Sequence, residues 1–320
     1  MVAISAASAL LFPGTGNAGG VPAPSQSNTS RQAPGVWNER RCCQSKLKKI
    51  NARLGKARFK TGAKGMKGMD RNHGRKSCRA PLGGVPTSGE LALEIGRLFL
   101  GAPYRAGTLT TGGREKLLAI LTAFDCTTFV ETILALTRAA ASGSLTPARF
   151  RGNLRFIRYR QGRMEGYASR LHYFTDWLRD NQKKKVLRDV SGLLGGRPVR
   201  KTIDFMTAHR DLYAGLKSKD QFCRMRTIEK KLSRRIFHIV DQRAAAKRPS
   251  AIRGGDIIAL ATDREGLDVA HVGFAIRQNG HWHLLHASSK ENAVVISKET
   301  LLGYLKAHPD LTGILIARIL

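Results

Sequence analysis

The sequence predicts an α+β protein in which a helical part comes first and packs on a C-terminal antiparallel sheet. Apolar residues recur at helical spacing between residues 90 and 234, whereas from residue 256 they form short runs rich in Val, Ile, Leu and Ala. Between two of these runs stands Gln278-Asn279-Gly280, which indicates a hairpin because Asn-Gly tolerates positive φ. Helices first and strands second favour α+β over an alternating α/β arrangement.

The first part contains segments whose apolar residues fall on one helical face. Gly101 and Gly143 follow two of them closely, which is typical of helix ends. The expected helices are Glu90–Leu100, Glu115–Phe124, Thr127–Ala141, Pro147–Arg158, Ser169–Gln182, Asp211–Leu216 and Gln221–Arg234. A Gly-rich turn over Gly192–Gly196 precedes the last two.

The second part contains short apolar runs bounded by turn residues. The expected strands are Asp256–Ala261, Val269–Arg277, Trp282–Ala287, Val294–Ser297 and Gly313–Arg318. The Asn-Gly turn joins the second and third strands, so these two are expected to pair. No internal repeat is found.

Charge is the unusual feature of the composition. The 320 residues carry 55 Lys and Arg against 23 Asp and Glu, a formal net charge of +32. Such an excess makes an anionic partner plausible: nucleic acid, an anionic envelope polymer or a membrane surface. No apolar run is long enough for a transmembrane helix, so the sequence predicts no transmembrane segment.

Residues 1–86 are expected to be a disordered basic N-terminal tail or leader, and residues 87–320 a folded domain. The tail holds 16 Lys and Arg but only Glu39 and Asp70, with few large apolar residues to bury. Val2–Phe12 is similar to the apolar region of a signal peptide, but no basic residue precedes it. The tail could instead be an arm for nucleic acid or another polyanion.

Cys126 is a candidate nucleophile because it stands at the start of an apolar-faced helix. Backbone N–H groups and the helix dipole at that position favour a thiolate, and Asp125 or Thr127 could cap the turn. The alternative is a buried structural cysteine. The five cysteines include no C-x-x-C pair, so a zinc site of that type is not expected.

His271 and His286 are expected on the two strands joined by the Asn-Gly turn. Adjacent strands lie about 5 Å apart, so the two rings can meet, and one can orient the other. A cysteine, a histidine base and an orienting group form a general nucleophilic arrangement, here in the papain-like order. Neither a metal-ligand spacing nor a phosphate-binding Gly loop is present, so no metal and no cofactor are expected.

Five short blocks, in order along the chain, resemble the NlpC-type cysteine hydrolases of bacterial cell walls, a papain-like superfamily. They are Gly101-Ala102-Pro103-Tyr104, Asp125-Cys126-Thr127, Gly255-Asp256, His271-Val272-Gly273 and His286-Ala287-Ser288. The chain between Cys126 and His271 is longer than in the minimal domain. It resembles the AmiA-like branch of N-acetylmuramoyl-L-alanine amidases, with a helical insertion at about 149–235.

The resemblance implies roles for the matched residues. Cys126 is the implied nucleophile, His271 the base, and His286 the residue that orients the base. Tyr104 is implied to support the oxyanion together with the backbone N–H of Cys126. The resemblance further implies a substrate-binding role for Arg170, His172 and Tyr173 of the S-R-L-H-Y segment, and for Asp125 and Ser288.

The implied function is cleavage of the amide between N-acetylmuramic acid and L-alanine in muropeptides. The expected location is the bacterial envelope, periplasmic or secreted, and the expected partners are peptidoglycan fragments. Three alternatives stay open: a γ-D-glutamyl–diamino acid endopeptidase, a thiol acyltransferase on the same fold, and a basic nucleic-acid-binding protein that uses residues 31–80. The first two need Cys126, whereas the third does not.

Overall fold

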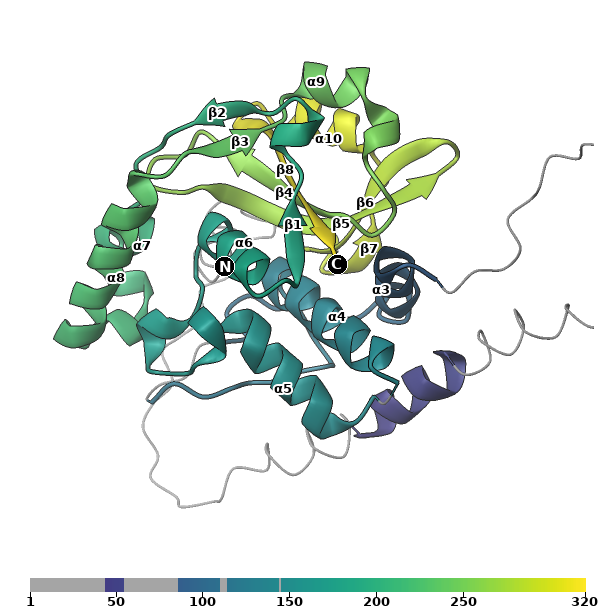
Figure 1. The fold of residues 1–320 in the computed structure, drawn as a ribbon, viewed down its shortest axis with the longest axis horizontal. Coiled ribbons are helices and arrows are strands. Elements are labelled where there is room, and N and C mark those ends of the chain that lie inside the picture. The colour runs from purple at the N-terminus through teal and green to yellow at the C-terminus, as the bar shows by residue number, and fades with distance from the viewer. Residues whose placement is uncertain (1–43, 55–85, 110–113, 144) are drawn as a thin grey trace, which may run out of the picture.

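The computed structural model describes residues 44–54, 86–109, 114–143 and 145–320. Its centre is a six-stranded, wholly antiparallel sheet with the order β1-β8-β4-β5-β6-β7 (Figure 1). The strands are β1 (Leu187–Asp189), β4 (Ile257–Thr262), β5 (Val269–Gln278), β6 (His281–Ser288), β7 (Ala293–Ile296) and β8 (Leu311–Ile319). A separate pair joins β2 (Arg197–Val199) and β3 (Phe237–Ile239). The α+β prediction is confirmed, and each predicted strand overlaps an observed one.

The hairpin between β5 and β6 forms at the predicted turn. Gln278 pairs with His281, so Asn279 and Gly280 make a two-residue loop. Both have positive φ, 47° and 81°, which only a few residue types adopt at low cost.

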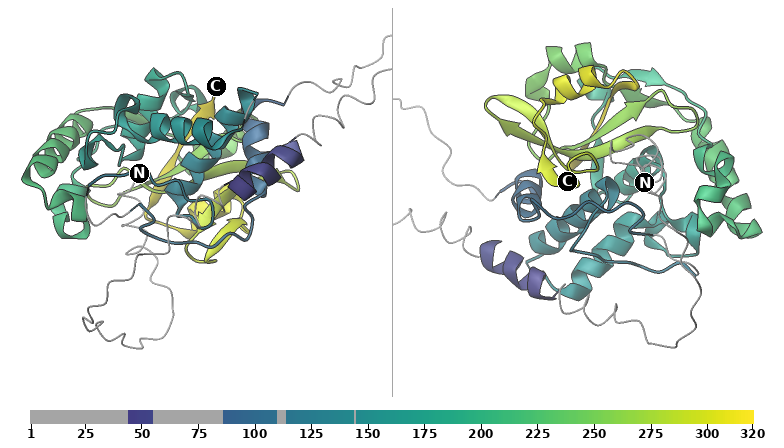
Figure 2. Two further views of the ribbon diagram at one scale, coloured as in Figure 1. Left: turned by 90° about the horizontal axis from the view of Figure 1, so that it is seen from below. Right: turned by 180° about the vertical axis from the view of Figure 1, so that it is seen from behind.

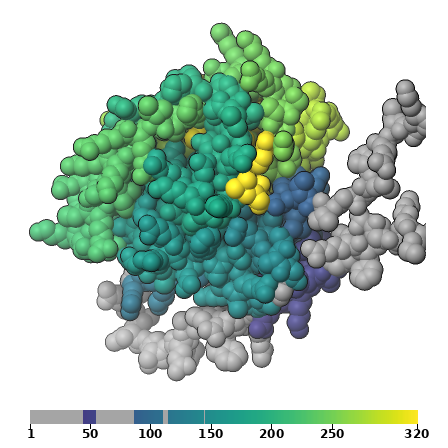
Figure 3. All heavy atoms as spheres, viewed as in Figure 1, coloured from purple at the N-terminus to yellow at the C-terminus, as the bar shows by residue number. Residues whose placement is uncertain are grey.

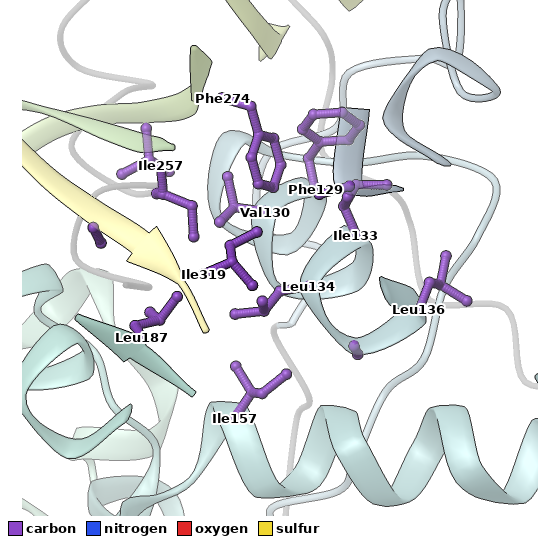
Figure 4. Packing of buried hydrophobic residues seen from close by; sticks show 14 of the residues in the cluster. Phe129, Val130, Ile133, Leu134, Leu136, Ile157, Leu187, Ile257, Phe274 and Ile319 are labelled. Atoms are coloured by element: carbon purple, nitrogen blue, oxygen red, sulfur yellow. The ribbon is translucent and has the colours of Figure 1, made fainter. Parts of the chain in front are cut away.

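The long helix α4 (Cys126–Ala141) is the core of the molecule. Fourteen of its sixteen residues are buried, because the sheet covers one side and other helices cover the rest. Figure 4 shows Val130 and Leu134 of α4 packed with Ile257, Phe274 and Ile319 of the sheet. Around α4 lie α3 (Ser88–Arg97), α5 (Pro147–Arg158) and α6 (Phe174–Lys183).

The opposite face of the sheet carries a thinner layer. It contains α9 (Gln242–Lys247) and α10 (Leu301–Ala307), which pack on Ile258, Leu260 and Leu284. Figure 1 and the view from behind in Figure 2 show the sheet between these two layers. To one side lie α7 (Phe205–Ala208) and α8 (Lys219–Ser233). Residues 149–235, expected as a helical insertion, thus also supply the strands β1 and β2.

One predicted helix is wrong: residues 115–124 are not helical. Their backbone groups are satisfied by distant partners instead of by one another. The carbonyl of Leu118 accepts from Arg158 Nη1 at 2.6 Å, and that of Leu121 accepts from Lys46 Nζ at 2.6 Å. Long-range contacts therefore override a local apolar period.

Two more predicted helices differ in detail. The helix predicted from Ser169 begins at Phe174, because Arg170 forms a β-bridge with Tyr159 and Leu171 N–H donates to the Arg158 carbonyl. The segment Asp211–Leu216 forms two 3₁₀ turns, η4 (Arg210–Leu212) and η5 (Ala214–Leu216), rather than an α-helix.

Part of the segment expected to be disordered is folded. Residues 44–54 form a helix whose Leu47 and Ile50 are buried in the main core, and Asn51 donates to the Leu145 carbonyl. A short apolar stripe is enough here because it adds to an existing core and needs none of its own. The rest of residues 1–86, apart from Pro86, and most of the predicted 31–80 arm, lie outside the described residues. In the described part of the chain, no helix is both long enough and apolar enough to cross a membrane.

Candidate active site

Cys126 is the first residue of α4, and Asp125 is the N-cap. The Asp125 carboxylate accepts from Thr128 N–H at 2.7 Å, and Thr128 Oγ1 accepts from Asp125 N–H at 3.0 Å, which makes a reciprocal capping box. This fixes the first turn of the helix. The backbone N–H of Cys126 lies at a position where helices leave N–H groups without an intrahelical acceptor.

The Cys126 thiol sits where the sheet opens between β5 and β6. These two strands pair only from Phe274 and Leu285 outward to the hairpin turn. Before Phe274 they no longer pair, and the backbone N–H of Val272 lowers the pKa of the Cys126 thiol, against the larger effect of burial. The opening of the ladder therefore brings a backbone donor into the neighbourhood of the thiol.

His271 and His286 meet across this opening. His271 Nε2 lies 2.6 Å from His286 Nδ1, and the two rings are almost perpendicular, at 88°. The contact depends on Gly273, because a Cβ at that position would lie 2.9 Å from the Cβ of His286. The prediction that the two histidines meet across the hairpin is confirmed.

The Cys126 thiol and the imidazoles of His271 and His286 are all electrically neutral at rest. Burial, and then the neighbouring Asp125 carboxylate, raise the pKa of Cys126 to about 12, although N–H donors from Val272 and Thr127 act in the opposite direction. Burial, and then His286 and His308, hold the pKa of His271 well below its usual value. Burial lowers the pKa of His286 to about 4. The expected resting thiolate is therefore not found, because burial outweighs the helix start.

Tyr104 brings a hydroxyl close to the Cys126 thiol. Burial raises its pKa, and charge on Cys126 and Asp125 raises it further, so the hydroxyl stays protonated and able to donate. Its Oη is buried and has no hydrogen-bond partner among the described residues. A buried donor that lacks an acceptor among the described residues can donate to a group that a bound substrate brings to it.

A pocket of about 120 Å³ opens on the α10 side of the histidine pair. Sequence reasoning missed three of the residues that line it: Glu299, Tyr304 and His308. The Tyr304 ring lies 6.3 Å from that of His286 and 4.7 Å from that of His308. Charge on Cys126 is the second cause, after burial, of the raised pKa of Tyr304, about 12, so this hydroxyl is also near the thiol.

Asp125 and Ser288 both lie at the site, in supporting positions. The second carboxylate oxygen of Asp125 accepts from Thr108 Oγ1 at 3.2 Å, so the side chain is held from both sides. Ser288 lines the pocket, and its hydroxyl accepts from the N–H of Glu291 at 3.1 Å, which closes the turn after β6.

Arg170, predicted to line the substrate cleft, is buried in an ion pair. Its Nη2 lies 2.5 Å from Glu115 Oε1, with only 3% of each side chain exposed. The same carboxylate oxygen accepts from Tyr159 at 2.6 Å, and Arg170 also donates to the Leu109 carbonyl. These contacts occupy the guanidinium, and Arg170 does not line the pocket beside His286.

His172 and Tyr173 are also buried and lie outside that pocket. Tyr173 donates to Glu229 at 2.7 Å and accepts from the N–H of Met206 at 2.9 Å. His172 Nε2 lies 2.8 Å from the Tyr167 carbonyl, and its Nδ1 has no partner among the described residues. Burial, and then Arg170, hold the pKa of His172 well below its usual value, so the ring is neutral.

Within the described residues, no three His, Cys, Asp or Glu side chains are arranged to hold a metal ion. The facing nitrogens of His271 and His286 form a hydrogen bond with each other. The site therefore contains a thiol, two neutral imidazoles and two protonated tyrosines.

Comparison with known proteins identifies the family. A family model described as AmiA-like, N-acetylmuramoyl-L-alanine amidase-like, matches residues 94–314. The chain belongs to the AmiA-like family. The resemblance inferred from the sequence motifs is thereby confirmed, and this AmiA-like chain is an enzyme.

Solved structures agree with this assignment. An N-acetylmuramoyl-L-alanine amidase from Bacteroides uniformis is 38% identical and superposes with a TM-score of 0.68, over 73% of this chain and 99% of its own. A putative xylanase from Bacteroides fragilis is 40% identical over 70% of this chain and 98% of its own, with a TM-score of 0.66. Protein LPG0564 from Legionella pneumophila, 20% identical over 89% of this chain and 97% of its own, has a TM-score of 0.63 and shares the fold. No curated protein matches the AmiA-like chain.

Proposed function

We propose that this AmiA-like enzyme is a cysteine hydrolase that cleaves the amide between N-acetylmuramic acid and L-alanine in peptidoglycan fragments. The observation that carries the proposal is the His271–His286 contact next to Val272, whose N–H lowers the pKa of the Cys126 thiol, together with a Tyr104 hydroxyl that has no hydrogen-bond partner among the described residues. The family and the amidase from Bacteroides uniformis support the choice of this bond.

The first half of the reaction forms a thioester. His271 takes the proton from Cys126 as the sulfur attacks the lactyl carbonyl carbon, so the neutral resting pair becomes a nucleophile and an acid only during attack. The carbonyl oxygen becomes an oxyanion, which the N–H of Cys126 and the Tyr104 hydroxyl stabilise. His271 then returns the proton to the leaving nitrogen, and the C–N bond breaks to release the L-alanyl peptide as a free amine.

The second half restores the enzyme. His271 removes a proton from water, which attacks the thioester carbonyl and releases the muramic carboxyl group together with the Cys126 thiol. His286 acts through His271. If His271 Nδ1 faces the thiol, its Nε2–H donates to His286 Nδ1, which fixes the ring and stabilises the imidazolium that forms in each half.

Mass spectrometry of defined muropeptides incubated with the full chain tests the proposal. The expected products are an intact stem peptide with a free L-alanine amine and a disaccharide with a free lactyl carboxyl group. Cys126→Ala should give neither product, whereas Cys223→Ala, which removes an exposed thiol on α8 that does not line the pocket beside the histidine pair, should give both.

Two results would overturn the proposal. Cleavage inside the stem peptide would instead assign an endopeptidase. Turnover by Cys126→Ala close to that of the wild type would show that Cys126 is not the nucleophile.

We further propose that the enzyme works in the bacterial cell envelope, where polymeric peptidoglycan is found. The basic excess of the chain suits a substrate whose stem peptides carry carboxylates.

A further inference from the structure

The helix α8 carries a surface that the chemistry at Cys126 does not use. Six basic residues stand on or next to this helix at exposed positions, and together they are called the basic face. They are Lys219, Arg224, Arg226, Lys230, Lys231 and Arg234. Asp220 is the one exposed acidic residue of α8, and it pairs with Arg224 at 3.1 Å. None of the other five forms an ion pair with any described residue.

The opposite side of α8 is already buried. Met225 and Leu232 pack in an apolar cluster that also contains Leu267 and Ala270, the residue before His271. Glu229, between them on this side, accepts from Tyr173 and Thr207. The apolar side of the helix is therefore not available to insert into a lipid surface, and only its cations face outward.

A groove runs beside the basic face. It has a volume of about 430 Å³ and lies between α8 and the two 3₁₀ turns η1 (Arg160–Gly162) and η2 (Tyr167–Ser169). Arg160, Arg163 and Arg224 line it, together with one carboxylate, Glu165. Asp176 holds the Arg160 guanidinium through two hydrogen bonds, of 2.6 and 3.2 Å, which fixes that cation in place.

The groove contains hydroxyl, amide and guanidinium groups but no aromatic side chain. Proteins that bind single-stranded nucleic acid usually stack bases on aromatic rings, so this lining does not favour single-stranded nucleic acid. Arginine and polar donors suit carboxylates and sugar hydroxyls better. Figure 1 shows α8 at the edge of the molecule, and Figure 3 shows the same surface, with no described element over its outer side.

We infer that the basic face and the adjoining groove dock a carboxylate-bearing glycan polymer, namely the peptidoglycan strand on which the proposed amidase acts. The inference rests on the proposed function for the identity of the polymer. The geometric link is the shared apolar cluster, which connects α8 to the strand that carries His271. Docking there would retain the enzyme on the wall between successive cleavages, because several weak charge contacts add along one polymer.

Co-sedimentation of the full chain with insoluble peptidoglycan sheets tests this inference. The Cys126→Ala background keeps the polymer intact, so binding is scored without turnover and is separate from the outcome for the proposed reaction. The double variant Lys230→Glu/Lys231→Glu should weaken retention about tenfold at low salt and reduce its salt dependence. The matched control, Arg151→Glu/Arg155→Glu on the exposed side of α5, makes the same change of net charge and should retain near-normal binding.

Two outcomes would overturn the inference. Equal loss in both double variants would show that net charge, and not this face, holds the enzyme on the wall. If Lys230→Glu/Lys231→Glu loses binding to a DNA duplex or to phosphatidylglycerol vesicles but keeps its retention on the sheets, in the same buffer, the face belongs to a different partner. If the reversed charges lower the melting temperature, the neutral pair Lys230→Gln/Lys231→Gln replaces them and should lose retention to a smaller extent.

Discussion

The polar cluster around Cys126 and the polar cluster around Arg170 are both buried, and the sequence predicts a functional role for both. They differ in whether their polar groups have hydrogen-bond partners. Around Cys126, the Tyr104 hydroxyl has no partner in the described part of the chain, and the histidine pair faces a pocket. Around Arg170, in contrast, the guanidinium meets the Glu115 carboxylate at 2.5 Å, and Tyr159 donates to the same oxygen. A satisfied cluster stabilises the fold, whereas an unsatisfied one holds donors ready for a group that appears only during reaction.

The largest expected effect is on turnover, at His271. His271→Ala removes the only base that can take the Cys126 proton in the proposed reaction, so kcat should fall by about 10³-fold or more. The melting temperature should change little, because the ring lines a pocket and its hydrogen bond is to His286. Steady-state kinetics beside thermal unfolding checks both parts. Turnover that persists would place the base elsewhere.

The next effect is at Tyr104. Tyr104→Phe deletes the proposed oxyanion donor and leaves the ring, so kcat should fall about 10²–10³-fold. Because Tyr104 Oη makes no hydrogen bond to any described residue, the free energy of unfolding should be unchanged or slightly higher. An effect confined to KM would instead show that this hydroxyl binds the substrate and does not stabilise the transition state.

The opposite pattern is expected at Glu115. Glu115→Gln leaves the Arg170 guanidinium buried without its countercharge, which should cost about 3–5 kcal/mol of unfolding free energy. Urea denaturation measures this. The control is Asp220→Asn, whose exposed partner is Arg224, and it should cost less than about 1 kcal/mol. Equal losses in both variants would contradict the assignment of a structural role to the Arg170 cluster.

A smaller effect concerns the reactivity of the two described cysteines. Because burial raises the pKa of Cys126 to about 12, its thiol should stay protonated through pH 9 and react with iodoacetamide more slowly than the exposed Cys223. The raised pKa of Cys126 also makes the free energy of unfolding depend on pH. The unfolded thiol ionises near pH 8.5, so stability from the neutral folded thiol is present below that pH and decreases as pH rises toward 12. Peptide mapping of labelled protein at several pH values measures the rates, and faster labelling of Cys126 would reveal a preformed thiolate.

The parts predicted well from the sequence depend on neighbours close along the chain. Cys126 follows a local capping signal, and His271 and His286 flank a hairpin whose turn sequence fixes the pairing. A capping residue and a turn sequence each determine the local backbone conformation, so the contact between the two histidine rings could be predicted.

The parts missed depend on distant packing. Tyr304 and His308 reach the pocket only because α10 folds back over the sheet, and no motif records that position. The S-R-L-H-Y resemblance predicts that Arg170 binds substrate, but such a resemblance carries no information on burial, and the side chain is buried. Its partner Glu115 lies 55 residues earlier, in a stretch that the local apolar period assigns to a helix.

The most direct measurement compares His271→Gln with Glu115→Gln in one buffer, with kcat on a defined muropeptide and the melting temperature recorded for each. The contrast between the two clusters predicts that His271→Gln loses turnover at nearly unchanged melting temperature. Glu115→Gln should lose melting temperature and keep measurable turnover for each folded molecule. The reverse pattern, with an active His271→Gln protein or a fully stable but inactive Glu115→Gln protein, would contradict the assignment of chemistry to the cluster around Cys126.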